Sequence, residues 1–165
     1  MIRIREVIVA TDFSEPAAVA LDYGRNFARA FDATLHVVHV ANDLATAAPV
    51  SEIPMDISKI QAQIEAEGRA ALEAAVTDDD RRSLRVKTVL LTSSTPARAI
   101  LTYARDAMAD LIIVGTHGRG GLAELLLGSV AQKVVRSAPC PVLTVRSHER
   151  DFIGPDALTV VERKE

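Results

Sequence analysis

Short apolar runs alternate along this chain with longer segments in which apolar residues recur every three or four positions. The runs are rich in Val, Ile and Leu, and such near-continuous runs are typical of strands buried on both faces of a sheet. They predict strands at residues 7–10, 35–40, 86–91, 110–114 and 141–146. The periodic segments predict helices at residues 14–31, 57–75, 95–107 and 129–137.

This alternation of strands and helices predicts an α/β fold: a single three-layer, Rossmann-like domain with a five-stranded parallel sheet and helices on both faces. In such sheets, ligands bind beyond the carboxyl ends of the strands, where the strand order reverses. A binding site is therefore expected at the ends of the apolar runs.

Three segments do not fit the alternation. Residues 42–56 contain two prolines and no clear period, which predicts a long loop. The charged run at 78–82 is interpreted as a solvated turn. Residues 147–165 form a C-terminal tail whose packing the pattern does not define. Within the helix at 57–75, Gly68 costs about 1 kcal/mol relative to alanine, and the sequence offers no reason for it.

Composition narrows the function classes. A chain of 165 residues that is 48% hydrophobic can bury one core without metals or disulfides. The net charge of −3 argues against a nucleic-acid partner. The apolar runs are far shorter than the roughly 20 residues that a membrane-spanning helix needs. A single cysteine, Cys140, excludes an internal disulfide. We therefore expect a cytoplasmic protein without a membrane partner.

The strongest chemical signal is the glycine segment GTHGRGG at 115–121, which is followed by Gly128-Ser129. It leaves a predicted strand and ends where a helix begins. Glycines let backbone N–H groups approach a phosphate closely, and the amino end of a helix adds free N–H donors and a favourable dipole. The alternative is that these glycines only turn the chain. No Walker A loop is present, and the G-x-G-x-x-A match at 118–123 lies in the fourth βα unit, not in the first as a dinucleotide site requires.

The spacing G-x2-G-x9-G-[ST] at Gly115, Gly118 and Gly128-Ser129 resembles the ATP-binding signature of the universal stress protein family. The similarity extends to residues 9–14 (VATDFS) and 138–143 (APCPVL). It implies an adenine nucleotide alpha hydrolase-like fold, with a universal stress protein domain at 1–146 and the tail at 147–165 outside it. Ser94 departs from the family, which usually has glycine there.

The resemblance also implies roles for individual residues. Asp12 faces the ribose or the metal-bound phosphates, although capping the first helix is an equal alternative. Ala10, Thr11 and Val40 line the adenine and sugar. The phosphates are held by the residues of the signature and its flanks: Gly115, Gly118, Arg119, Gly128, Ser129 and Val130. Apart from the resemblance, His117 and His39 fall near strand ends and are interpreted as surface or ligand-edge contacts without an acid–base role. The implied ligands are ATP and Mg²⁺, with the metal bound through the phosphates and not by protein side chains.

Three functions remain open at this point. The first is an ATP-binding regulatory protein of the stress response, and the second is a slow ATPase or phosphotransfer enzyme. The third is an interaction domain without nucleotide. No general base, catalytic lysine or carboxylate pair can be assigned, so no catalytic residue is predicted. The strand at 141–146 carries no internal charge, which predicts a homodimer formed by antiparallel pairing of this strand. The alternative is that the tail covers the same edge.

Overall fold

The computed structural model of the chain describes residues 1–47, 56–116 and 127–146. These residues form one five-stranded sheet in which every strand is parallel to its neighbours, in the order β3-β2-β1-β4-β5. The strands are β1 (Glu6–Ala10), β2 (Thr34–Ala41), β3 (Arg85–Thr92), β4 (Leu111–Gly115) and β5 (Val142–Val145). All five predicted strands are present, and the predicted parallel α/β architecture is confirmed.

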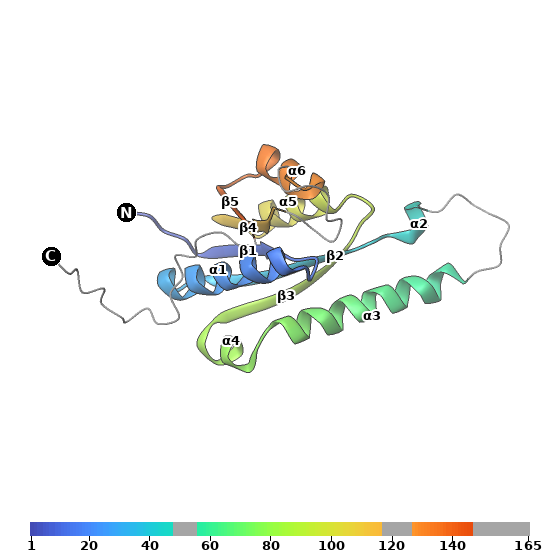
Figure 1. Cartoon of the computed structure of the whole chain (residues 1–165), viewed down its shortest axis with the longest axis horizontal. Helices are drawn as coiled ribbons and strands as arrows, with labels where there is room; N and C mark the ends of the chain where they lie inside the picture. Colours follow the sequence, from blue (N-terminus) through green and yellow to red (C-terminus); the bar gives the residue numbers. More distant parts are fainter. Residues whose placement is uncertain (48–55, 117–126, 147–165) are drawn as a thin grey trace.

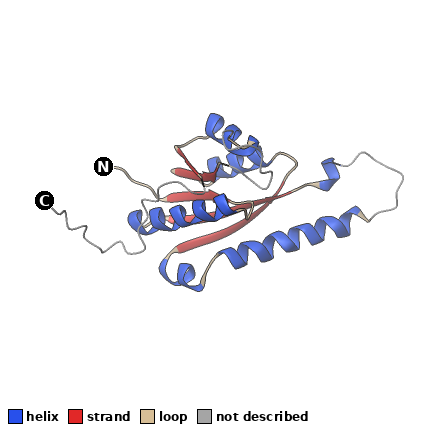
Figure 2. Cartoon of the chain, in the orientation of Figure 1, coloured by secondary structure: helices blue, strands red, loops and turns tan. Residues whose placement is uncertain are grey.

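The long helices cover both faces of the sheet (Figures 1 and 2). They are α1 (Glu15–Phe31), α3 (Ile57–Ala75), α5 (Pro96–Asp106) and α6 (Ser129–Ser137). Helices α1 and α3 contribute to one hydrophobic cluster with the sheet, whereas α5 and α6 contribute to a second cluster on the opposite face. Within the described ranges, no helix is long and apolar enough to cross a membrane.

The alternation of side chains along the strands explains these two clusters. Val7 and Val9 of β1 are fully buried in the cluster on the α1 side, and Ile8 between them is fully buried in the cluster on the α5 side. A strand whose residues are buried in both directions needs apolar residues at consecutive positions. The continuous apolar runs in the sequence therefore follow directly from the three-layer arrangement.

Gly68 has a packing role that the sequence did not reveal. A Cβ atom at this position would lie 2.9 Å from Cδ1 of Leu90 and 3.2 Å from Cδ2 of His39. Helix α3 thus approaches β2 and β3 so closely at Gly68 that a side chain would force its neighbours to move. Glycine costs conformational entropy within a helix, but here it lets the backbone of α3 lie directly against the sheet.

Two of the expected irregular segments contain helix. The predicted loop at 42–56 includes a short helix, α2 (Leu44–Ala47), and residues 48–55 of this loop lie outside the described ranges. The run expected to be a solvated turn forms α4 (Asp78–Ser83), which begins with a capping box between Thr77 and Asp80. Asp80 is buried, so the interpretation of the whole run as solvated was wrong. The reason is a partner from α1, Arg25, which a local reading of the sequence cannot detect.

Candidate functional site

The strand order reverses between β1 and β4. The chain passes from β1 to β2 and β3 on one side, and then crosses to β4 and β5 on the other side. Ala10 at the end of β1 is in register with Val114, one residue before the end of β4. The connections that leave these two adjacent strands therefore diverge from the same edge, which is where ligands bind in open parallel sheets.

The connection after β1, residues 11–14, is called here the Asp12 loop. Thr11 is buried, and its N–H donates to the carbonyl of Val38 at 2.8 Å, so the loop begins as a continuation of the sheet. The carboxylate of Asp12 accepts hydrogen bonds from the backbone N–H and from the hydroxyl of Ser14. Asp12 is not the N-cap of the first helix, because Ser14 occupies that position, but its bonds to Ser14 hold its carboxylate at the carboxyl edge of β1.

Helix α1 follows directly, with Ser14 at the N-cap position and proline in the first turn. The side chain of Ser14 makes no capping hydrogen bond. Its hydroxyl donates to Asp12 instead. The predicted start of the helix is confirmed, and the side chain of Ser14 holds Asp12 instead of capping the helix.

The connection after β4 contains Gly115, the first glycine of the signature. A Cβ atom at this position would lie 3.0 Å from the carbonyl carbon of Pro16 and 3.1 Å from the amide nitrogen of Ala17. The first turn of α1 therefore occupies the space where a side chain would be. This close approach explains why residue 115 is a glycine. Contact of its backbone with a phosphate stays a prediction.

The chain re-enters the described part just before α6. The N–H of Gly128 donates to the carbonyl of Thr116 at 2.6 Å, and the N–H of Thr116 donates to Val145 at 2.8 Å. Thr116 is buried, so this pair of bonds fixes the amino end of α6 beside the carboxyl ends of β4 and β5. Gly128 is the N-cap residue and Ser129 begins the helix. The first N–H groups of a helix have no partner within it, so they are available to an anion at this edge.

Three apolar positions predicted to line the ligand pack against the same hydrophobic cluster. Ala10, Val40 and Val130 belong to β1, β2 and α6, and all three are partly buried against the cluster on the α5 side of the sheet. Leu127, which the sequence did not single out, packs against the same cluster. These four residues, called here the apolar wall, lie on the α5 side of the sheet. The predicted residues His117, Gly118 and Arg119 lie outside the described residues.

His39, expected as a surface or ligand-edge contact, is bonded to the Asp12 loop. Its Nδ1 atom lies 2.8 Å from the carbonyl oxygen of Thr11, and its ring contacts the ring of Phe13, with the two centroids 4.5 Å apart. His39 thus contacts the Asp12 loop from the side of the sheet that α3 covers. The sequence showed only that a histidine lies near the end of a buried strand. That position does not predict the contact with Thr11 and Phe13.

The described part of the chain contains no group of three or more His, Cys, Asp or Glu side chains arranged to hold a metal ion. The site consists instead of an apolar wall, a carboxylate and the amino end of a helix. These features fit a ligand with an apolar or aromatic part, hydroxyl groups and an anionic end, and an adenine nucleotide has all three.

Comparison with known proteins gives a consistent family. The sequence model of the universal stress protein family matches residues 3–146. Universal stress protein MJ0531 of Methanocaldococcus jannaschii is 31% identical over 149 residues, which cover 89% of this chain and 85% of that protein. Universal stress protein YxiE of Bacillus subtilis is 32% identical over 146 residues, which cover 86% of this chain and 98% of that protein.

Solved structures show the same fold. The universal stress protein UspA from Lactobacillus plantarum superposes with a TM-score of 0.77 at 24% identity, covering 88% of this chain and 100% of that chain. A universal stress protein in complex with cAMP has a TM-score of 0.57 at 25% identity, covering 88% and 98%. One from Archaeoglobus fulgidus in complex with dAMP has a TM-score of 0.58 at 24% identity, covering 88% and 99%.

Proposed function

Because this chain belongs to the universal stress protein family, we propose that it is a regulatory protein that binds ATP, with Mg²⁺ held through the phosphates. The adenine and sugar lie against Ala10, Thr11 and Val40, and Asp12 faces the ribose or the metal-bound phosphates. The phosphates lie against the glycine signature, which consists of Gly115, Gly118, Arg119, Gly128, Ser129 and Val130, with His117 at the ligand edge.

One observation supports the proposal: the Asp12 loop follows β1 and the amino end of α6 is hydrogen-bonded beside the end of β4, at the two adjacent strands where the strand order reverses. The carboxylate, the apolar wall and the helix end each suit one part of an adenine nucleotide. Relatives of this fold have been solved with cAMP and with dAMP. The preference for a triphosphate rests on the glycine signature and on the donors at the start of α6.

A regulatory role is preferred over an enzymatic one. Asp12 accepts two hydrogen bonds from Ser14, which suits a positioned carboxylate more than a general base. His39 is engaged with a backbone carbonyl. We therefore expect ATP hydrolysis or phosphotransfer to be slow at most, and bound nucleotide to change the shape or partners of the protein.

We also propose a homodimer formed through β5. Strand β5 is at the end of the sheet and, in the described part of the chain, pairs only with β4. Its residues Val142 to Val145 carry no charge. In this proposal the nucleotide-binding domain spans residues 1–146, and residues 147–165 are a tail outside it.

Calorimetric titration of the full chain with ATP, ADP, AMP and cAMP, each with and without Mg²⁺, tests the function. We expect ATP with Mg²⁺ to bind most tightly and turnover to be slow compared with release. Rapid hydrolysis would instead identify an enzyme. Absence of binding by every adenine nucleotide would favour the third alternative, an interaction domain without nucleotide.

A further inference from the structure

We propose that His39 is a positioning residue of the nucleotide site: it fixes the Asp12 loop to β2 and to helix α3, and thereby sets the affinity for nucleotide. The inference rests on the proposed function, because it concerns how the same site is held in shape. It assigns no contact between His39 and the ligand.

The Asp12 loop needs such support because its backbone is strained. Phe13 has a φ of 63°, in the left-handed region, where residues other than glycine are uncommon. One hydrogen bond within the loop favours this turn, from the N–H of Phe13 to the hydroxyl of Thr11 at 3.0 Å. A non-glycine residue keeps such a conformation only where its surroundings impose it.

His39 supplies that constraint from outside the loop. A backbone carbonyl only accepts hydrogen bonds, so the 2.8 Å contact requires a proton on Nδ1 of His39, which donates to Thr11. The ring also packs against Phe13 at 42° between the ring planes. The residues on both sides of Asp12 are therefore in contact with one imidazole ring.

Helix α3 fixes the imidazole in turn. A Cβ atom at Gly68 would lie 3.2 Å from Cδ2 and 3.8 Å from Nε2 of His39, so the backbone of α3 lies directly against the ring. The ring is thus enclosed by α3 on one side and by the Asp12 loop on the other. Movement of α3 relative to the sheet is transmitted to the loop through this ring.

Loss of the imidazole should weaken nucleotide binding without removing any atom that contacts the nucleotide. Without it, the carbonyl of Thr11 loses its partner and Phe13 loses the ring that holds its side chain. The bound orientation of Asp12 then has to be selected from a broader set of loop conformations. We expect the affinity for ATP to fall about tenfold, the effect of losing one hydrogen bond to a buried group.

The test compares two substitutions. His39→Leu fills part of the space but removes the donor, whereas His39→Asn places an amide N–H close to the position of Nδ1. ATP affinity is measured by calorimetry, and amide exchange at Phe13 and Ser14 is measured without nucleotide. Leu35→Val, on the same face of β2 but toward its amino end, is the control for general destabilisation.

We expect His39→Leu to weaken ATP binding and to accelerate exchange at Phe13 and Ser14, while His39→Asn restores much of both and Leu35→Val changes neither. A folded His39→Leu protein with the affinity and exchange of the native protein overturns the inference. If His39→Leu does not fold, His39→Gln takes its place and is compared with His39→Asn. The amide of glutamine reaches the position of Nε2 and not that of Nδ1, so it does not restore the donor. A native protein that binds no adenine nucleotide refutes the proposed function alone, because the exchange comparison still decides whether His39 holds the loop.

Discussion

Nε of Arg25 lies 3.0 Å and 2.9 Å from the two carboxylate oxygens of Asp80, although 55 positions separate the two residues in the sequence. The side chain of Asp80 is only 3% exposed. Burial by itself would raise the pKa of Asp80, but the hydrogen bonds from Thr77 and the guanidinium of Arg25 outweigh it and hold the pKa below its usual value. This ion pair fixes α4 to α1.

Replacing Asp80 by alanine should therefore destabilise the protein strongly. The substitution leaves the guanidinium of Arg25 without its main partner in a largely buried position, and it removes the capping interaction with Thr77. We expect a loss of about 3 kcal/mol in the free energy of unfolding. Asp79→Ala is a matched control, because the neighbouring carboxylate is 67% exposed. Urea denaturation measures the free energy of unfolding of both variants. Equal, small losses in the two variants would show that the buried ion pair contributes little to stability.

A second prediction concerns pH. His36 is 2% exposed; its Nε2 lies 2.5 Å from a carboxylate oxygen of Glu6, and its Nδ1 lies 2.7 Å from the hydroxyl of Tyr103. Nε2–H donates to the carboxylate, and Nδ1 accepts from Tyr103. Burial lowers the pKa of His36, and the contact with Glu6 offsets this only in part.

Because the pKa of His36 is lower in the folded protein, the unfolded protein binds more protons as the pH falls. The contribution of neutral His36 to stability is therefore fully present above the unfolded pKa of about 6.5 and is lost as the pH falls below it. We expect the free energy of unfolding to decrease between about pH 7 and pH 5, and to decrease less in His36→Gln. Urea denaturation at several pH values tests this. A native protein that becomes more stable toward pH 5 would show that Glu6 keeps His36 protonated.

The phosphate position can be tested at Gly128. Its φ of −55° and ψ of 150° are accessible to any residue, so valine there adds volume without imposing backbone strain. We expect Gly128→Val to remain folded and to lose ATP binding, because the branched side chain fills the space in front of the helix end. Gln132→Val places the same side chain on an exposed part of α6 one turn later and should bind normally. Unchanged ATP affinity in folded Gly128→Val would refute the site, and Gly118→Val tests the second glycine of the signature.

The proposed dimer can be tested at Thr144. The carbonyl of Pro141 accepts a hydrogen bond from β4 and that of Val145 from Thr116, which follows β4. The backbone groups of the alternate residue Thr144 therefore point away from β4. Thr144→Pro removes an outward N–H and leaves the pairing with β4 intact. We expect it to be monomeric by light scattering, whereas Thr144→Val, which keeps the N–H, remains dimeric. A native protein that is monomeric at micromolar concentration would show that this edge is covered in another way.

The sequence predicted the strands and long helices well because their signals are local. A strand such as residues 7–10 is apolar at every position, and a helix such as α5 begins at a proline and carries a periodic apolar stripe. The glycine signature likewise indicated which edge of the sheet to examine. These features depend on residues that are close in the sequence.

The parts that were missed depend on contacts between distant residues. The charged run at 78–82 looks solvated until Arg25 is placed beside Asp80, and Gly68 has no evident purpose until α3 lies on His39. His39 itself was interpreted only as a surface or ligand-edge contact, because nothing in the sequence shows that its partner is the carbonyl of Thr11. Such roles follow only from the way in which the helices pack on the sheet.

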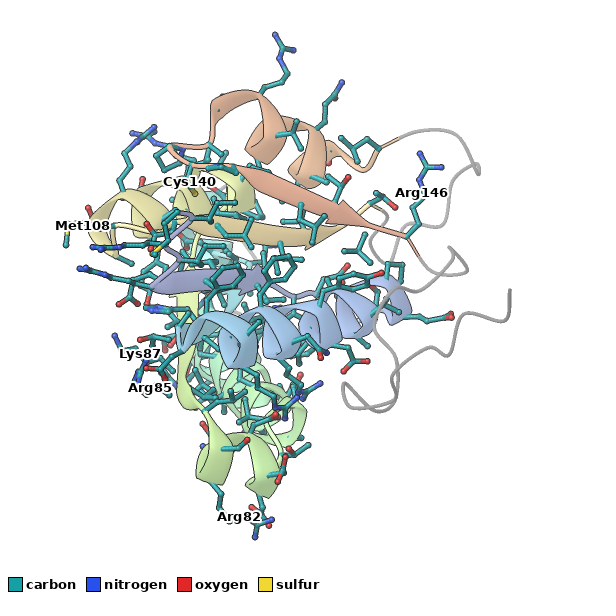
Figure 3. The ribbon with its side chains drawn as sticks, turned by 90° about the vertical axis from the view of Figure 1, so that its left-hand side faces the viewer. Arg82, Arg85, Lys87, Met108, Cys140 and Arg146 are labelled. Carbon is teal, nitrogen blue, oxygen red and sulfur yellow. The ribbon has the colours of Figure 1, made fainter. Side chains whose placement is uncertain are left out.

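The two edges of the sheet differ in a way that limits assembly. Strand β3 begins with Arg85 and carries Lys87, both exposed, whereas β5 on the opposite edge is uncharged (Figure 3). Charged side chains on an edge strand oppose pairing with another strand. A sheet with two permissive edges would extend into an open ribbon as each added chain offered a new edge. With a single permissive edge, growth stops once two chains have joined, so the arrangement that allows a dimer also protects the protein against polymerisation.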